Sequence, residues 1–263
     1  GMPHHSSMSY INRLLQAGHR VAVCEQTQAA EEAEGLVERG VVRVITPGTL
    51  LEESILEEKK NNYLAAAVSE GGLAWVDLST GIFQLSTVVP ERLRDEIMRL
   101  SPSELLIPAA LEESDFVQNL DGFGQMIITP FADWRFDSEN AFRILTEHFE
   151  VKSLEGFGCP EADHGVRAAG AALAYLLDTQ RGPLLHISKM ERHRGEDRLF
   201  LDEQTQRALE LTETVRGGDR KGTLLWALDR TESSMGARLL REWVTLPLRS
   251  VERIRERHSA VQE

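Results

Sequence analysis

Cysteine, aromatic residues and long apolar runs are all scarce in this chain. Its 263 residues include only two cysteines, Cys24 and Cys159, which excludes a disulfide framework and a cysteine-rich zinc site and predicts reduced thiols in a cytoplasmic protein. No segment approaches the roughly 18 consecutive apolar residues that a membrane-spanning helix needs, so we expect no membrane partner. The first five residues, GMPHH, also lack the basic and then apolar order of a signal peptide.

Motifs for nucleotide binding and nucleophilic catalysis are missing as well. The sequence holds no G-x-x-x-x-G-K-[ST] phosphate loop, no G-x-G-x-x-G after a strand and no G-x-S-x-G nucleophile elbow. The segment GGDRKGT at 217–223 has the wrong spacing for a phosphate loop, and no buried strand precedes it, so we expect a loop between helices. We therefore predict no catalytic and no cofactor-binding residue in this chain.

The histidines do not suggest a metal site. His4 and His5 are adjacent and have no carboxylate partner nearby, so we expect them in an exposed turn. His186 and His193, with Glu191 between them, lack the spacing of zinc ligands and are predicted to lie in a surface loop.

Asp77 is the one carboxylate that invites a catalytic interpretation. Nucleases of the ribonuclease-H fold hold two divalent ions with clustered acids on their strands. Here the predicted strands at 104–107 and 126–129 offer only Glu104 as a further acid. Asp77 is followed by Ser79-Thr80-Gly81, and an aspartate in that position usually accepts hydrogen bonds from the turn. We predict a turn cap and no metal ligand.

The charge is divided unevenly along the chain. Residues 1–180 carry 13 Lys and Arg against 28 Asp and Glu, a net charge of −15, whereas residues 181–263 carry 16 against 14. The acidic part should repel the DNA backbone, because non-specific binding depends mainly on phosphate neutralisation. The last two predicted helices are basic, and we expect a solvated helix face, with an interdomain or phosphate contact as the alternative. Their arginines are Arg238, Arg241, Arg249, Arg253, Arg255 and Arg257.

Hydrophobic patterns predict a multidomain chain. Residues 1–55 contain one helix and two short strands, at 21–24 and 41–45, which cannot close a sheet, so we interpret them as the end of a larger α/β domain. Residues 56–158 show three strands joined by tight turns and then alternating helix and strand, the order of a ribonuclease-H-like layer. Residues 159–263 are predicted to be all-α, and Met235, Leu239 and Trp243 form one helical stripe. The chain has the pattern of a middle piece cut at both ends.

Two joints between these segments are expected to move, with rigid joints that merely lack regular structure as the alternative. Residues 50–62 are charged and lack an apolar stripe, which is typical of a mobile linker. Residues 155–160 contain two glycines and a proline beside Phe157, which favours a hinge with one anchoring side chain.

Several segments, taken in order, resemble the bacterial MutS family of mismatch-repair proteins. Each motif alone is weak, but their shared order covers essentially the whole chain. The segments are GMPHH (1–5), GHRVAVCEQ (18–26), VVRVITPGT (41–49), NYLAA (62–66), DLSTG (77–81), LDRT (228–231), MGARLLR (235–241) and LPL (246–248).

The resemblance implies a division of labour in the complete protein. It would be a homodimeric clamp that binds mismatched double-stranded DNA, exchanges ADP for ATP with Mg, and recruits a MutL-type partner. The chain would contain the end of the mismatch-binding domain, the connector domain and the start of the core domain. The mismatch-reading Phe-x-Glu would precede residue 1, and the clamp and ATPase domain would follow residue 263. The fragment would then couple domains without catalysis; a ribonuclease-H-fold nuclease and a stand-alone protein-interaction module are the alternatives.

Overall fold

The protein is described by a computed structural model for residues 4–26, 37–50, 61–120, 126–159, 163–182, 184–193, 198–199 and 201–262. The described residues fall into two compact units. The sheet unit holds the described residues up to position 50, together with 62–93 and 101–192. The helical unit holds Asn61, residues 94–100 and the described part of 193–263. Among the described residues, no helix is long and apolar enough to cross a membrane.

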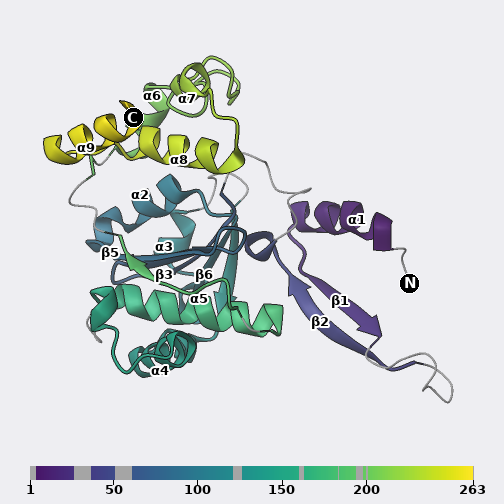
Figure 1. Cartoon of the computed structure of the whole chain (residues 1–263). Coiled ribbons are helices and arrows are strands. Elements are labelled where there is room, and N and C mark those ends of the chain that lie inside the picture. The colour runs from purple at the N-terminus through teal and green to yellow at the C-terminus, as the bar shows by residue number, and fades with distance from the viewer. Residues whose placement is uncertain are drawn as a thin grey trace. The chain divides into compact units, whose positions relative to one another are not determined.

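A six-stranded mixed sheet forms the centre of the sheet unit (Figure 1). The first three strands along the chain form an antiparallel meander, and the next two add in parallel on the far edge of the first, which is the predicted ribonuclease-H-like order. The spatial order is β7-β6-β3-β4-β5-β8. The strands are β3 (Tyr63–Val68), β4 (Gly72–Asp77), β5 (Ile82–Thr87), β6 (Glu104–Pro108), β7 (Ile127–Phe131) and β8 (Glu191–Arg192).

Local sequence explains the β3–β4 hairpin. Both strands are apolar and almost wholly buried, as expected for central strands that are covered on both faces. The turn between them needs Gly71, whose φ is +98° and where a Cβ atom would lie 2.0 Å from the Val88 carbonyl oxygen. The predicted strands at 63–69, 73–78 and 82–88 are confirmed to within a residue at each end.

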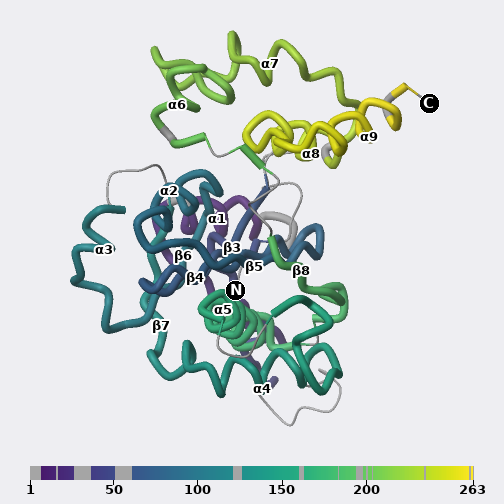
Figure 2. Tube along the Cα trace, turned by 90° about the vertical axis from the view of Figure 1, so that its left-hand side faces the viewer, coloured from purple at the N-terminus to yellow at the C-terminus, as the bar shows by residue number. Residues whose placement is uncertain are grey.

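Two helices, α4 (Ser138–Phe149) and α5 (His164–Gln180), share the main hydrophobic core with the sheet. Both views show α5 against the sheet and α4 beside α5 (Figures 1 and 2). The two helices approach closely at Gly170, where a Cβ atom would lie 2.4 Å from the Cβ of Ala141. The Asp163 side chain caps α5 by accepting a hydrogen bond from the Gly165 nitrogen at 2.7 Å.

The predicted boundary at residue 158 is therefore wrong. Helix α5 was expected in the all-α segment, but its alanine-rich face is buried on the sheet, and β8 continues the sheet beyond that position. The predicted hinge at 155–160 also falls inside the sheet unit. Its residues include the short 3-10 helix η5 (Glu155–Phe157), where Phe157 packs on Phe149 with ring centroids 5.2 Å apart, and Cys159 is buried in the same core. A helical pattern shows that a face is apolar, but not which surface covers it.

The N-terminal segment of the sheet unit consists of α1 (His4–Gln16), β1 (Val21–Gln26), β2 (Arg39–Ile45) and the 3-10 helix η2 (Pro47–Thr49). The strands β1 and β2 pair antiparallel as a two-stranded sheet. The strand predicted at 21–24 is confirmed, but it is largely exposed and not buried as expected. The predicted helix stop at Gly18 is also confirmed, since Gly18 has a φ of +80°. The short helix predicted around 55–60 lies outside the described residues.

Along the chain, shorter elements and one amphipathic helix separate the strands, and residues 94–100 of that helix belong to the helical unit. Leu93 and Ile97 are both completely buried and lie on one side of that helix, as the sequence predicts. The elements are α2 (Pro90–Leu100), η3 (Ala109–Leu111), α3 (Asp115–Gln118) and η4 (Asp133–Phe136).

The helical unit contains α6 (Glu203–Ala208), α7 (Leu224–Leu228), α8 (Ser234–Thr245) and α9 (Val251–Gln262). The predicted caps are confirmed: Asp202 accepts from the Thr205 nitrogen, and Ser233 accepts from the Gly236 nitrogen. The predicted stripe on α8 is not buried in this unit, because Met235 is 73% and Leu239 is 46% exposed.

Candidate functional site

Asp77 caps the turn that follows β4. Its Oδ1 accepts hydrogen bonds from the Ser79 nitrogen (2.9 Å) and the Ser79 hydroxyl (2.6 Å), and its carbonyl oxygen accepts from the Gly81 nitrogen (2.9 Å). This is the turn that the sequence predicts. Within the described ranges, no group of three or more His, Cys, Asp or Glu side chains is placed to hold a metal ion.

The histidines singled out from the sequence lie at the start of α1 and in loops. His4 and His5 begin helix α1 and do not form the exposed turn that was predicted. His186 is exposed in a loop, as expected, but His193 is half-buried and Glu191 lies in β8. Burial, and then the positive charges of Arg99 and Arg198, lower the pKa of His193 to about 4. His193 is therefore a neutral imidazole near pH 7.

The glycine-rich segment at 217–223 is a loop between α6 and α7, as predicted. Gly217, Gly218 and Gly222 all have positive φ, and the Thr214 hydroxyl accepts a hydrogen bond from the Asp219 nitrogen at 3.0 Å. Thr223 caps α7, which begins only after the loop has closed on itself. The loop geometry is thus accounted for by local turns.

A concentrated polar site of the sheet unit is centred on Glu104, the first residue of β6. Its side chain is completely buried, and four donors converge on its carboxylate. Oε2 accepts from the Thr46 hydroxyl (2.5 Å) and the Gly48 nitrogen (3.1 Å). Oε1 accepts from the Thr129 hydroxyl (2.8 Å) and the Tyr175 hydroxyl (2.7 Å). Buried carboxylates require such partners, since an unpaired one would be strongly destabilising.

The two carboxylate oxygens face different parts of the unit. Oε2 accepts hydrogen bonds from the segment that follows β2. Oε1 accepts hydrogen bonds from β7 and α5, which belong to the sheet layer, that is, β3–β8 with α4 and α5. Burial, and then the Glu104 carboxylate, raise the pKa of the Tyr175 phenol well above its usual range, so the phenol stays a donor. We call Glu104, Thr46, Gly48, Thr129 and Tyr175 the Glu104 cluster.

Further contacts surround the Glu104 cluster. The Asn62 side chain donates to the Pro47 carbonyl oxygen (3.0 Å) and accepts from the Ser103 hydroxyl (2.5 Å). The Arg181 side chain donates to the Val41 carbonyl oxygen (3.0 Å), which adds a direct tie between β2 and the end of α5. The segment after β2 is therefore held by several elements of the sheet layer.

Sequence reasoning identified Glu104 only as an isolated acid on a strand. Its partners lie 25 to 71 residues away in the chain, so no local pattern could bring them together. The available signal was a charged residue at the head of the apolar run Leu105–Ile107, which predicts either an exposed strand end or a buried, fully paired carboxylate.

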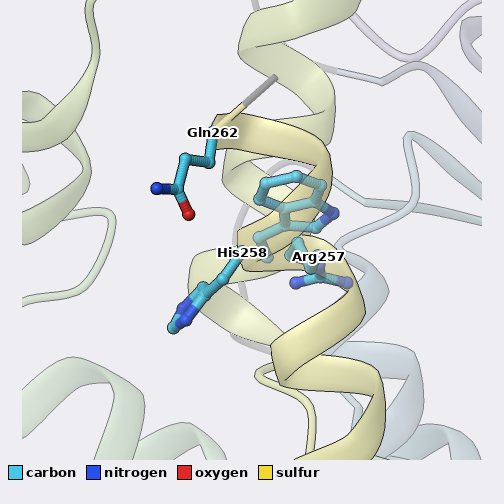
Figure 3. A pocket seen from close by; sticks show the side chains of 4 residues that line it. Arg257, His258 and Gln262 are labelled. Carbon is cyan, nitrogen blue, oxygen red and sulfur yellow. The ribbon is translucent and has the colours of Figure 1, made fainter.

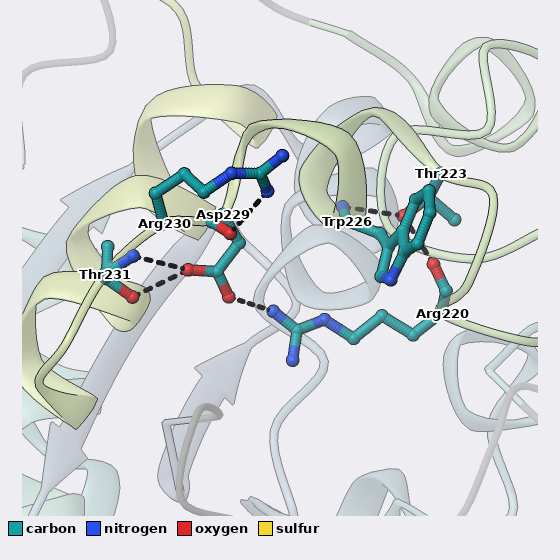
Figure 4. Close-up of polar contacts among 6 residues, drawn as sticks. All are labelled: Arg220, Thr223, Trp226, Asp229, Arg230 and Thr231. Carbon is teal, nitrogen blue, oxygen red and sulfur yellow. Dashed lines mark hydrogen bonds and ion pairs between the residues drawn. The ribbon is translucent and has the colours of Figure 1, made fainter.

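A second polar centre lies in the helical unit, around Asp229 (Figure 4). Oδ1 of Asp229 accepts from the Thr231 nitrogen (3.0 Å) and hydroxyl (2.6 Å), and Oδ2 is paired with Arg220. Its carbonyl oxygen accepts from Arg230 (3.0 Å), and Thr223 links the Arg220 carbonyl to the start of α7. These partners lie within nine residues of Asp229, so this centre ties α7 to the start of α8 locally.

The predicted basic face of α8 and α9 is confirmed in part. Arg249, Arg253 and Arg255 are exposed, but the Arg257 guanidinium lies 3.9 Å from the centre of the Trp243 ring. Together with His258 and Gln262 these two residues line a pocket of about 400 Å³ (Figure 3). Burial, and then the positive charge of Arg198, lower the pKa of Arg257.

Comparison with known proteins divides the chain into three matched segments. Family models for MutS domain I, MutS domain II and MutS domain III match residues 1–54, 62–188 and 204–263. The domain II match includes α5 and ends near the observed boundary of the sheet unit, which agrees with the corrected assignment of that helix.

Curated relatives match over the full chain. The DNA mismatch repair protein MutS of Symbiobacterium thermophilum is 43% identical over 270 residues, which cover all of this chain and 31% of the relative. The MutS proteins of Synechococcus elongatus and Halothermothrix orenii are 42% and 41% identical and are covered to 32% and 30%. The chain thus spans about a third of the length of the curated relatives that it matches. With three successive domains matched in order, the chain belongs to the MutS family of DNA mismatch repair proteins.

Proposed function

We propose that this chain is the part of a mismatch-recognition protein that links its DNA-reading domain to its helical core. The observation that carries the proposal is the ordered match to MutS domains I, II and III across the chain. In the parent protein, the complete set of domains binds mismatched double-stranded DNA as a homodimeric clamp that depends on ATP and Mg. The chain itself contributes coupling and no catalysis.

The geometry supports coupling over a nuclease function. A ribonuclease-H-type nuclease needs several carboxylates around its metal ions, whereas Asp77 is engaged in the turn to Ser79. The other buried strand acid, Glu104, is occupied by four donors from the protein. Both carboxylates therefore serve the architecture of the sheet unit.

The connector, which corresponds to the sheet layer of β3–β8 with α4 and α5, is proposed to recruit a MutL-type partner. It has no chemistry of its own in this proposal and moves as a body when the nucleotide state of the parent changes. The apolar side chains that α7 and α8 leave exposed support packing against further segments of the core in the parent, and Trp226 (48%) and Met235 (73%) are examples.

DNA binding by the parent and by the chain separates this proposal from its alternatives. Fluorescence anisotropy with matched and single-mismatch duplexes at physiological salt is expected to give mismatch preference for the parent, and only weak, salt-sensitive binding for the chain. The net charge of −15 over residues 1–180 opposes phosphate contacts. Submicromolar mismatch preference of the chain alone would contradict this assignment of the recognition function.

Two further measurements address the alternatives. Metal-dependent cleavage of DNA by the chain that is lost in Asp77→Ala would establish the nuclease. Binding of a MutL-type protein to the chain, measured by biolayer interferometry and competed by the parent, supports the coupling role. If the parent shows no mismatch preference but binds the partner, the protein-interaction module is the better description.

A further inference from the structure

The junction between the N-terminal segment and the sheet layer contains the carboxylate of Glu104. It accepts more hydrogen bonds from the protein than a carboxylate at the end of a strand needs. Glu104 accepts four hydrogen bonds and is completely buried, although its place at the start of β6 would allow a carboxylate to reach solvent. Burying a carboxylate is costly unless every acceptor position is used.

The four donors are divided between the two carboxylate oxygens of Glu104. One oxygen is held by Thr129 and Tyr175, which are themselves buried in the sheet layer, so the carboxylate has a fixed orientation before the N-terminal segment is considered. The other oxygen then presents two acceptor directions to Thr46 and Gly48. A backbone N–H and a hydroxyl that converge on one oxygen restrict both the distance and the direction of approach.

Contacts within the N-terminal segment couple the position of Thr46 to β2 and α1. Ile45, directly before Thr46, is buried in a small core with Ile11 and Leu15 of α1. The Thr49 hydroxyl accepts from the Thr46 nitrogen at 2.9 Å, which closes the segment 46–49 on itself. Any change in the position of Thr46 therefore moves β2 and α1 together.

Gly48 permits this close approach. A Cβ atom at Gly48 would lie 2.9 Å from the Glu104 Cβ, 3.0 Å from Leu64 Cδ1 and 3.1 Å from the Glu104 Oε2. Only glycine lets the backbone nitrogen reach the carboxylate without displacing the sheet.

We propose that Glu104 is a positioning residue that locks the end of the mismatch-binding domain to the connector, so that the two move as one body. The fixed orientation of the N-terminal segment relative to the sheet layer is a property of this chain. Its use in signalling rests on the proposed function, because it would carry a displacement of the DNA-reading domain into the connector. This lock places the rigid junction at residues 46–50, which end where the linker at 50–62 that the sequence predicts to be mobile begins.

Distance measurements between two spin labels test the lock in the 263-residue chain. One label is placed at Arg13→Cys on α1 and the other at Lys152→Cys after α4, and both positions are exposed. Cys24→Ser and Cys159→Ala are included in every variant, the reference among them. The reference, which carries the two labels and no change in the Glu104 cluster, is expected to give a narrow distance distribution by pulsed electron–electron double resonance.

The decisive comparison uses two substitutions that each remove one hydroxyl from the same carboxylate. Thr46→Val removes a donor on the N-terminal side, and Thr129→Val removes one on the sheet side. Thr46→Val and Glu104→Ala should widen the distribution by about twofold or more, whereas Thr129→Val should leave its width unchanged. A merely structural role would make the two threonine variants equivalent.

Glu104→Gln provides the conservative rescue. Its amide oxygen can accept from Thr46 and Gly48, while its NH₂ group donates to the Thr129 and Tyr175 hydroxyls, which are able to accept. We expect Glu104→Gln to retain most of the narrow distribution. Hydrogen exchange in β3 and β4 checks that each variant is folded.

The proposal is overturned if the reference distribution is already as wide as that of Thr46→Val, or if both threonine variants widen it equally. Neither outcome affects the proposed function, which the DNA-binding comparison of chain and parent tests separately.

Discussion

The two units of this protein differ in how they use apolar residues. In the sheet unit, a long central helix is buried almost from end to end, and Leu173 of α5 has no exposed surface. In the helical unit, α7 and α8 contribute few buried side chains, and large ones such as Leu228 (51%) and Leu239 (46%) lie open. The sheet unit therefore has a core of its own, whereas the helical unit depends on more local interactions.

The two carboxylate centres repeat this difference. Glu104 is buried among neutral donors that lie far apart in sequence, so its hydrogen bonds form only when the tertiary structure is in place. Asp229 is paired with Arg220 and caps the turn to Thr231, so it reports local structure. Long-range contacts need a formed core, while local ones need only a turn.

The largest expected effect contrasts one leucine from a helix of each unit. Leu173→Ala should cost about 3 kcal/mol of the free energy of unfolding, because it leaves a cavity between α5 and the sheet. Leu239→Ala should cost less than about 0.5 kcal/mol, since the side chain is half exposed. Hydrogen exchange followed by mass spectrometry measures each unit separately. Equal losses in the two variants would mean that the helical unit has a core comparable to that of the sheet unit.

Lowering the pH is expected to have an intermediate effect on the free energy of unfolding of the helical unit. The pKa of His193 in the folded protein is about 4, below its unfolded value near 6.5, so protonation favours the unfolded state. The contribution of neutral His193 to the free energy of unfolding is fully present above pH 6.5. It is lost as the pH falls through 6.5 towards 4. We expect the helical unit to lose on the order of 2 kcal/mol over this range, while α5 stays protected.

The control for the pH effect is His193→Gln, which has no titrating side chain. In this variant, the protection of α8 amides relative to their intrinsic exchange rate should become nearly independent of pH between 6.5 and 4.5. An unchanged pH dependence in His193→Gln, or an earlier loss of protection in the sheet unit, would assign the sensitivity to other groups.

The smallest effect sharpens the comparison of the two carboxylates. Asp229→Ala removes the cap to Thr231 and the Arg220 pair and should cost about 1 kcal/mol of helical-unit stability. Arg220→Ala removes only the pair and should cost less than about 0.5 kcal/mol, because the arginine is 41% exposed. Urea unfolding monitored by hydrogen exchange in α7 and α8 can resolve the two. Equal costs would show that the ion pair, and not the turn, stabilises this region.

Local features of the chain were predictable from its sequence. The strands around Gly71, the helix stop at Gly18 and the caps at Asp202 and Ser233 follow from interactions within a few residues, which short sequence patterns record directly. The ordered motifs also identified the family, because their collinearity does not depend on knowing which elements touch.

Only the tertiary structure decided where α5 belongs and what Glu104 binds. The apolar face of α5 fits a helix bundle and a sheet equally well as a pattern, and its burial on β3 and β4 selected the sheet. Glu104 is a lone strand acid in the sequence, and it becomes a junction only when Thr46, Thr129 and Tyr175 meet it. Both depend on contacts between segments far apart in the chain, for which a single sequence carries no periodic or local signal.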